Sequence, residues 1–131
     1  MGQMRTLGYI AVGGIIGSLG RYGLDLLASG NLPLEPQDFP LSTLAVNLIG
    51  CLAIGILAPV LLVRTGWPNA RPFLITGILG GFTTFSALAA QSGVLLLDGQ
   101  GWRAAAYLVA TLAGGLLAVR LGMRITERQP R

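Results

Sequence analysis

A short polar stretch, GGFTTFS at positions 80–86, interrupts one of the long apolar segments of the sequence. Its two glycines, and Gly77 before them, are weak helix formers, and two threonines and a serine follow at once. A helix that breaks here inside a membrane would expose carbonyl oxygens, which suit a bare cation, and amide N–H groups, which suit an anion. The alternative is a continuous helix whose hydroxyl groups bond back to its own carbonyls, and the spacing favours neither.

Other polar side chains inside apolar segments could line a path for an ion. Asn47 is one, because an amide at membrane depth is costly unless it finds a partner, either on a neighbouring helix or in a pathway. Tyr107 and Thr111 are four residues apart and share one helix face, which Gly115 extends, so they indicate either a polar track or helix packing. Arg21 closes the first apolar segment, where it could anchor the helix at the interface or attract an anion to a vestibule.

The composition requires a membrane around these residues. Of 131 residues, 53% are apolar and 11% charged, with nine arginines, five acids and no lysine or histidine. A small soluble domain needs far more polar surface, because its surface is large for its volume. Four apolar runs are long enough to cross the roughly 30 Å hydrocarbon layer at about 1.5 Å per residue. They predict an all-α integral membrane protein, one domain over residues 1–131, with four transmembrane helices at 7–27, 41–63, 73–97 and 102–123.

Several function classes do not fit this sequence. It has no Ser-His-Asp or Cys-His set, no Walker loop and no dinucleotide fingerprint, and four spans leave no room for a soluble catalytic domain. Its positive charge flanks the spans and does not form a nucleic-acid patch. The sequence therefore offers no signature of these enzyme classes or of a nucleic-acid-binding protein.

Small residues recur at the spacing of helix contacts. Gly13 and Gly17 form a GxxxG pair, as do Gly77 and Gly81, and a further stripe comprises Ala106, Ala110, Gly114 and Ala118. Such positions let helix backbones approach closely in lipid. Four thin helices enclose no aqueous pore by themselves, so a dimer or larger assembly is expected.

Arginines predict how the chain inserts in the cell (plasma or inner) membrane. An even number of spans puts both termini on one side, and the positive-inside rule makes the arginine-rich side cytoplasmic. The terminal side carries Arg5, Arg64, Arg71, Arg120, Arg124, Arg128 and Arg131, whereas the opposite side carries Arg21 and Arg103 with Glu35, Asp38 and Asp98. Both termini are therefore predicted to be cytoplasmic.

Three motifs in the same order resemble those of the Fluc (CrcB) family of fluoride channels. The first helix carries GGIIGSLGRY, which ends at Arg21 and Tyr22, and the third carries GGFTTFS. Between them, LSTLAVNLIG has Thr43, Asn47 and Gly50 in register. The resemblance covers the whole chain, and it is the combination of three motifs that makes it specific.

The resemblance implies two subunits assembled antiparallel, with the third helix broken at its middle. Two fluoride pathways would run along the subunit interface, and a structural sodium ion would lie at the centre. Backbone carbonyls of Gly80 and Thr83 from each subunit would hold the sodium. Asn47 would donate to fluoride, Phe85 would present its ring edge, and Arg21 would lie at the vestibule. The remaining pathway residues would be Thr43, Thr84, Ser86, Tyr107 and Thr111.

The chain departs from the family pattern at three positions. Leu88 stands where a second pathway phenylalanine is usual, Gln91 where a glutamate is typical, and Gly115 where a third hydroxyl is common. Uneven arginine counts also suit an antiparallel homodimer poorly, because such a dimer needs both orientations of one sequence. A heterodimer with an oppositely oriented paralogue is therefore an alternative to a homodimer.

Two further functions stay open from the sequence. Leu88 and Gln91 favour a non-conducting or accessory subunit. A small multidrug-type exporter also has four short helices, but it needs a membrane-embedded carboxylate that exchanges protons. The candidate for that role is Asp25, which lies one helical turn from Arg21 and is more simply its ion-pair partner.

Overall fold

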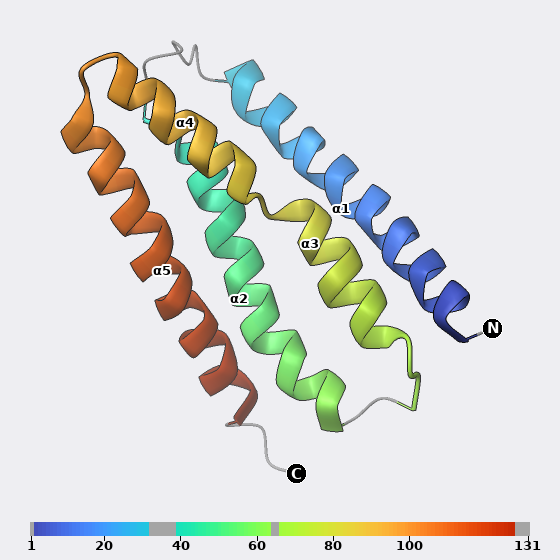
Figure 1. Cartoon of the computed structure of the whole chain (residues 1–131). Coiled ribbons are helices and arrows are strands. Elements are labelled where there is room, and N and C mark those ends of the chain that lie inside the picture. The colour runs from blue at the N-terminus through green and yellow to red at the C-terminus, as the bar shows by residue number, and fades with distance from the viewer. Residues whose placement is uncertain (1, 32–38, 64–65, 128–131) are drawn as a thin grey trace.

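Four long helical segments lie side by side in the structure, a computed structural model that describes residues 2–31, 39–63 and 66–127 (Figure 1). The description does not include the side chains of residues 28–31, 63 and 127. Part of the orientation prediction rests on residues outside the described ranges: Glu35, Asp38, Arg64, Arg128 and Arg131. The helices are α1 (Gly2–Asn31), α2 (Leu41–Val63), the π-helix η1 (Pro72–Leu79), α3 (Gly80–Phe82), α4 (Phe85–Leu97) and α5 (Gly101–Glu127).

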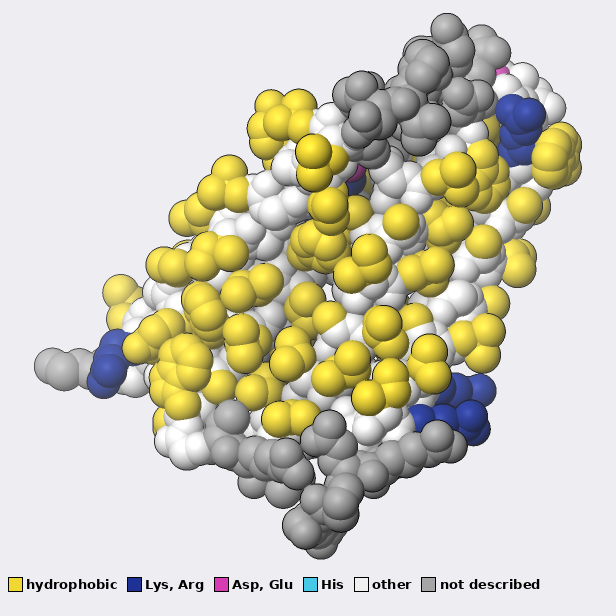
Figure 2. All heavy atoms as spheres, turned by 180° about the vertical axis from the view of Figure 1, so that it is seen from behind, with side chains coloured by type: hydrophobic (Ala, Val, Ile, Leu, Met, Phe, Trp, Pro, Cys, Tyr) yellow, Lys and Arg dark blue, Asp and Glu magenta, His cyan; other side chains and the backbone are white. Residues whose placement is uncertain are grey.

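Four stretches of these helices are long and apolar enough to cross a bilayer: Gly2–Leu27, Leu41–Leu62, Pro72–Leu97 and Gly101–Thr126. Most of their large apolar side chains are exposed in the single chain, and Figure 2 shows them across the middle of one face, with basic side chains toward the ends. Water is a poor solvent for such a surface. The architecture therefore fits an integral membrane protein.

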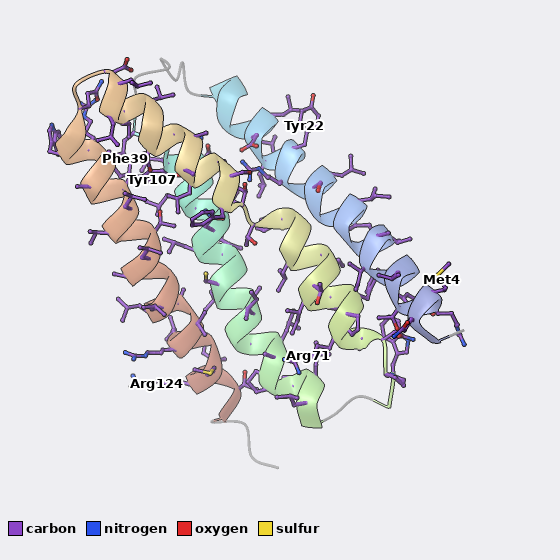
Figure 3. All side chains as sticks on the ribbon, viewed as in Figure 1. Met4, Tyr22, Phe39, Arg71, Tyr107 and Arg124 are labelled. Carbon is purple, nitrogen blue, oxygen red and sulfur yellow. The ribbon has the colours of Figure 1, made fainter. Side chains whose placement is uncertain are left out.

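The helices pack in two groups, and α2 contacts η1, α1 and α3 where the groups meet. α1 lies along η1 and α3, while α2 lies along α5, and α4 rests on α5 (Figure 1). α1 begins five residues before the predicted start and α5 continues four residues beyond the predicted end. Both extensions are at the arginine-rich end, where Figure 3 shows Met4, Arg71 and Arg124.

Glycines make the crossing of α1 with η1 and α3 possible, as the GxxxG spacing predicted. A Cβ added to Gly13 would lie 3.0 Å from the Cα of Gly77, and one added to Gly17 would collide with the Ile78 carbonyl. One added to Gly81 would collide with the Gly14 carbonyl. Backbone thus meets backbone along the whole crossing, which gives the helices dispersion contacts that larger side chains would prevent.

The contact face of α5 agrees only in part with the predicted small-residue stripe. Ala106 is exposed, but Ala110, Gly114 and Ala118 are partly buried, and a Cβ on Gly114 would lie 2.9 Å from Leu48 Cδ2 on α2. The buried positions on α5 are Ala104, Tyr107, Thr111, Gly115 and Gly122. Near the end of this face, a Cβ on Gly122 would lie 2.9 Å from the Cα of Gly55 on α2. The packing face is therefore the one that carries Tyr107 and Thr111.

Two extended residues separate α3 from α4. Thr83 has φ −81° and ψ 156°, and Thr84 has φ −147° and ψ 125°. The helix before them is already irregular, because η1 is wound as a π-helix, a conformation that often accompanies functional sites. The polar stretch GGFTTFS thus lies at a change of backbone direction halfway along the third membrane-crossing segment.

Candidate functional site

The Asn47 side chain makes hydrogen bonds at Thr84 to the extended backbone, Thr83 and Thr84, between α3 and α4. Its Oδ1 accepts from the Thr84 amide at 2.9 Å, and its Nδ2 donates to the Thr84 carbonyl at 3.2 Å. An amide side chain therefore pairs with the extended backbone in both directions, as a neighbouring strand would. α2 comes close enough for this because the next turn carries Gly50, where a Cβ would collide with the Thr83 methyl group.

Two carbonyl groups at the break lose their usual helical partners. The Thr84 amide, which would bond Gly80 in a continuous helix, donates to Asn47, and the Thr83 amide donates to Leu79. The Ala87 amide, which would bond the Thr83 carbonyl, donates instead to Thr84 Oγ1. The Gly80 and Thr83 carbonyls are thus oxygen atoms that the chain's own helix does not use.

A third carbonyl at the break has a different partner. Ser18 on α1 donates from its hydroxyl to the Gly81 carbonyl at 3.4 Å, so α1 also contributes to this region. At 3.4 Å this bond is long and therefore weak.

The start of α4 gathers the donors that the sequence predicted. Thr84 caps the helix by accepting from the Ala87 amide, and its hydroxyl also lies 3.1 Å from the Ser86 hydroxyl. Phe85 projects outward with 77% of its surface exposed. First-turn amides and the helix dipole make this end of α4 electropositive. The arrangement can therefore contact an anion with hydroxyl, amide and aromatic-edge groups.

An open groove of about 410 Å³ runs from the break across α2, α4 and α5. It contains six residues that the sequence assigned to a pathway or to a departure from it: Asn47, Thr84, Phe85, Leu88, Thr111 and Gly115. Thr83, assigned to the sodium site, also lines it, and the rest of the wall is Cys51, Ile54, Leu112, Leu116 and Val119. Polar groups therefore gather near the break, while the remainder of the groove is apolar.

Cys51 is a groove residue that the sequence did not single out. Its Sγ would lie 3.2 Å from a Cβ added to Gly115, so the thiol occupies the space beside the missing side chain. A single cysteine in an apolar segment offers no signal for this, because the neighbour that matters is on another helix.

Thr43, Gln91 and Tyr107 form a buried hydrogen-bonded cluster that joins α2, α4 and α5. Gln91 donates from Nε2 to Thr43 Oγ1 at 3.0 Å and accepts at Oε1 from the Tyr107 hydroxyl at 2.8 Å. Tyr107 is fully buried, and Phe39 contacts its ring edge to face at a centroid distance of 5.6 Å (Figure 3). Thr111 donates to the Tyr107 carbonyl at 2.8 Å. Tyr107 and Thr43 thus lie beside the groove without lining it.

Arg21 and Asp25 face each other on α1. The Arg21 Nε lies 3.4 Å from Asp25 Oδ2, and the Arg21 side chain is 19% exposed. Asp25 makes a further interaction as well. The pair is separate from the groove, and it gives the carboxylate a cationic partner on its own helix.

Comparison with known proteins identifies the family. A family model described as CrcB-like protein, Camphor Resistance (CrcB), matches residues 8–123. The Fluoride-specific ion channel FluC of Paracoccus denitrificans is 44% identical over 116 residues, which are 88% of this chain and 90% of that protein. A protein of the same name from Chlorobium phaeobacteroides is 41% identical over 123 residues, covering 93% of this chain and 92% of that protein. The Fluoride-specific ion channel FluC 1 of Moorella thermoacetica is 44% identical over 116 residues, covering 88% and 81%. The chain therefore belongs to the CrcB family.

Proposed function

We propose that two copies of this chain assemble antiparallel into a fluoride-selective channel that lets cytoplasmic fluoride leave the cell down its electrochemical gradient. Relatives that cover most of the chain carry the name fluoride-specific ion channel. The observation that carries the proposal is the extended backbone at Thr83 and Thr84. Asn47 is hydrogen-bonded to it, and it lies beside the electropositive start of α4. No covalent chemistry is required, so the protein acts as a channel and not as an enzyme.

Donors near the break suit a small, strongly hydrated anion. Asn47 Nδ2 carries two N–H groups and uses one for Thr84, which leaves one to donate. The Thr84 and Ser86 hydroxyls share one hydrogen bond between them, so one O–H proton stays available. Phe85 can add its electropositive ring edge. Several neutral donors replace water around fluoride without the deep electrostatic trap that a fixed cation would create.

A structural sodium ion fits the carbonyl groups at the break. The Gly80 and Thr83 carbonyls have no helical partner, and Gly80 is exposed on the surface of the single chain. In an antiparallel pair, the two carbonyls of each chain would supply four oxygen ligands, which a hard cation prefers. The sodium would tie the two breaks together and raise the local potential for an anion.

The exposed pathway residues favour a dimer. The groove is open along the single chain, and Phe85 at its edge is 77% exposed. A conduction path needs walls on all sides, because fluoride cannot pass beside lipid. A second copy facing this groove would provide the missing wall.

Anion efflux from liposomes that contain the purified chain tests this proposal. We expect rapid loss of fluoride and no loss of chloride, with slower fluoride loss when N-methylglucamine replaces sodium. Gel filtration before reconstitution, and protease accessibility of the termini afterwards, show that the protein is folded and inserted. Equal loss of both anions, or no fluoride loss from inserted protein, would contradict a self-sufficient fluoride channel.

Leu88 favours a second candidate, a subunit that conducts together with an oppositely oriented paralogue. Its buried side chain lines the groove one turn after Phe85, at the place where a second aromatic ring edge would meet the ion. Tagging both termini and testing their accessibility from each side decides between the two assemblies. Comparable populations of both orientations from this gene alone support the homodimer, whereas one orientation supports the heterodimer. The Arg21–Asp25 ion pair disfavours the exporter alternative, because a proton-exchanging carboxylate must be able to release its partner.

A further inference from the structure

A second groove, also of about 410 Å³, lies at the arginine-rich end of the molecule, where α1 begins. Three aromatic rings pack around it: Tyr9 meets Trp67 edge to face at 5.4 Å between centroids, and Trp67 meets Phe73 at 5.8 Å. The complete lining is Arg5, Gly8, Tyr9, Val12, Trp67 and Phe73. The conduction proposal uses none of these residues.

Its floor is one face of α1. Arg5, Gly8, Tyr9 and Val12 follow the spacing of three and four residues that places side chains above one another on a helix. Nothing lies within 4 Å of a Cβ added to Gly8, so this floor has free space above it. The groove thus has an arginine at its outer end and an apolar track that runs along α1 toward the middle of the membrane.

The other wall contacts α1. The Thr6 hydroxyl lies 3.1 Å from Asn69 Oδ1, in the segment that carries Trp67, and shares its one proton between this oxygen and the Gly2 carbonyl. Arg5 is exposed and makes no ion pair in the part of the chain that the structure describes. Its guanidinium can therefore meet an anion with the aromatic walls already in place.

We propose that this groove binds one anionic phospholipid, with its phosphate against Arg5 and one acyl chain along Gly8 and Val12. Charge complementarity selects the lipid, because an unpaired guanidinium at the membrane surface attracts a net negative headgroup more than a zwitterionic one. Tyr9, which is half-buried, and Trp67, which is 42% exposed, belong at headgroup depth, where aromatic rings with a polar atom concentrate. The proposal requires a membrane around the helices and does not depend on which ion the protein conducts.

Trp67 is a natural reporter for this lipid, since the chain has two tryptophans and Trp102→Phe leaves one. In liposomes, brominated phosphatidylglycerol and brominated phosphatidylcholine are compared as quenchers of Trp67 fluorescence at the same total anionic content. We expect phosphatidylglycerol to reach half-quenching at about one fifth of the mole fraction that phosphatidylcholine needs, the ratio that one arginine near the surface provides. Equal quenching by the two lipids would overturn the proposal.

Three variants separate a built site from general surface charge. Arg5→Gln should abolish the preference, and Gly8→Leu should reduce it by filling the groove while leaving the charge. Arg71→Gln, at the same end but not in the lining, is the matched control and should keep the preference. If Arg71→Gln lowers the preference as much as Arg5→Gln, or if Gly8→Leu keeps it intact, the lipid is held by diffuse charge and the site does not exist.

Discussion

Replacing Asn47 by alanine tests whether this side chain holds the break between α3 and α4. The substitution removes the acceptor for the Thr84 amide at 2.9 Å and the donor to the Thr84 carbonyl at 3.2 Å. The carbonyl still accepts within the first turn of α4, so its loss is small. The amide has no second partner at membrane depth, and an orphaned buried N–H costs about 1–3 kcal/mol.

Ser18→Ala is the matched control for this experiment. It also removes a side-chain hydrogen bond to the backbone at the break, but that bond is 3.4 Å long and Ser18 is exposed. We expect its loss to cost about 0.5 kcal/mol or less. Both effects are measured as the free energy of unfolding in mixed micelles with increasing dodecyl sulfate, at one protein concentration, because dimerisation would otherwise shift the apparent stability.

Amide hydrogen exchange gives the local readout. In Asn47→Ala the amide of Thr84 should exchange faster, by roughly 5- to 150-fold for about 1–3 kcal/mol, while amides in the middle of α5 should change less. If Asn47→Ala unfolds like Ser18→Ala and its Thr84 amide stays protected, Asn47 does not hold the break. Its amide group would then have to serve the proposed ion pathway alone.

Three further substitutions, two of them with a control variant, test the packing, the buried cluster and the groove. Gly17→Ala puts a Cβ against the Ile78 carbonyl and should lower the free energy of unfolding by about 1–3 kcal/mol in the same assay. Its control is Gly14→Ala, where an added Cβ meets no atom within 4 Å, and this variant should be more stable by about 1 kcal/mol or less. Gln91→Leu removes the acceptor of the buried Tyr107 hydroxyl and the donor to Thr43, and should cost about 1–3 kcal/mol. Ser92→Ala removes a buried hydroxyl that has no partner in the described part of the chain and should be neutral or stabilising. Leu88→Phe adds an aromatic edge to the groove and should raise fluoride efflux by about two- to tenfold, with no rise in chloride efflux. Equal changes in stability for Gly17→Ala and Gly14→Ala would contradict the helix contact, and equal changes for Gln91→Leu and Ser92→Ala would contradict the role of the cluster. An unchanged fluoride flux in Leu88→Phe would contradict the role of the groove.

The membrane-crossing segments could be predicted from the sequence because apolar length is a local property. Residues 41–63 were expected as a helix, and α2 has the bounds Leu41–Val63. The GxxxG spacing also predicted that glycines lie at close helix contacts, and the structure shows that Gly13 meets Gly77, a pairing that the sequence did not specify. Both features depend on residue size and on short spacing along one helix.

The break and the packing face of α5 depended on partners far along the chain. Thr83 and Thr84 could have continued the helix by bonding to its own carbonyls, and Thr83 does donate from its hydroxyl to Leu79. The hydrogen bonds that the extended backbone loses are replaced by those to Asn47, which is 37 residues away from Thr84. No local sequence pattern specifies this partner. On α5, Ala106 is as small as Ala104, and lipid provides no contrast in hydrophobicity to choose between faces.

Gln91 explains why one departure from the family pattern is compatible with a working channel. A glutamate here would be acceptor-only and anionic, so both Thr43 and Tyr107 would have to donate to it. Gln91 instead donates to Thr43 and accepts from Tyr107, which satisfies both ends of its amide and leaves the cluster neutral. A neutral cluster repels no anion, and Gln91 has no carboxyl proton that could be gained or lost beside the groove. Gln91 therefore joins α2, α4 and α5 without charge, and on the proposed pathway the aromatic edge replaced by Leu88 is the departure that would bear directly on the ion.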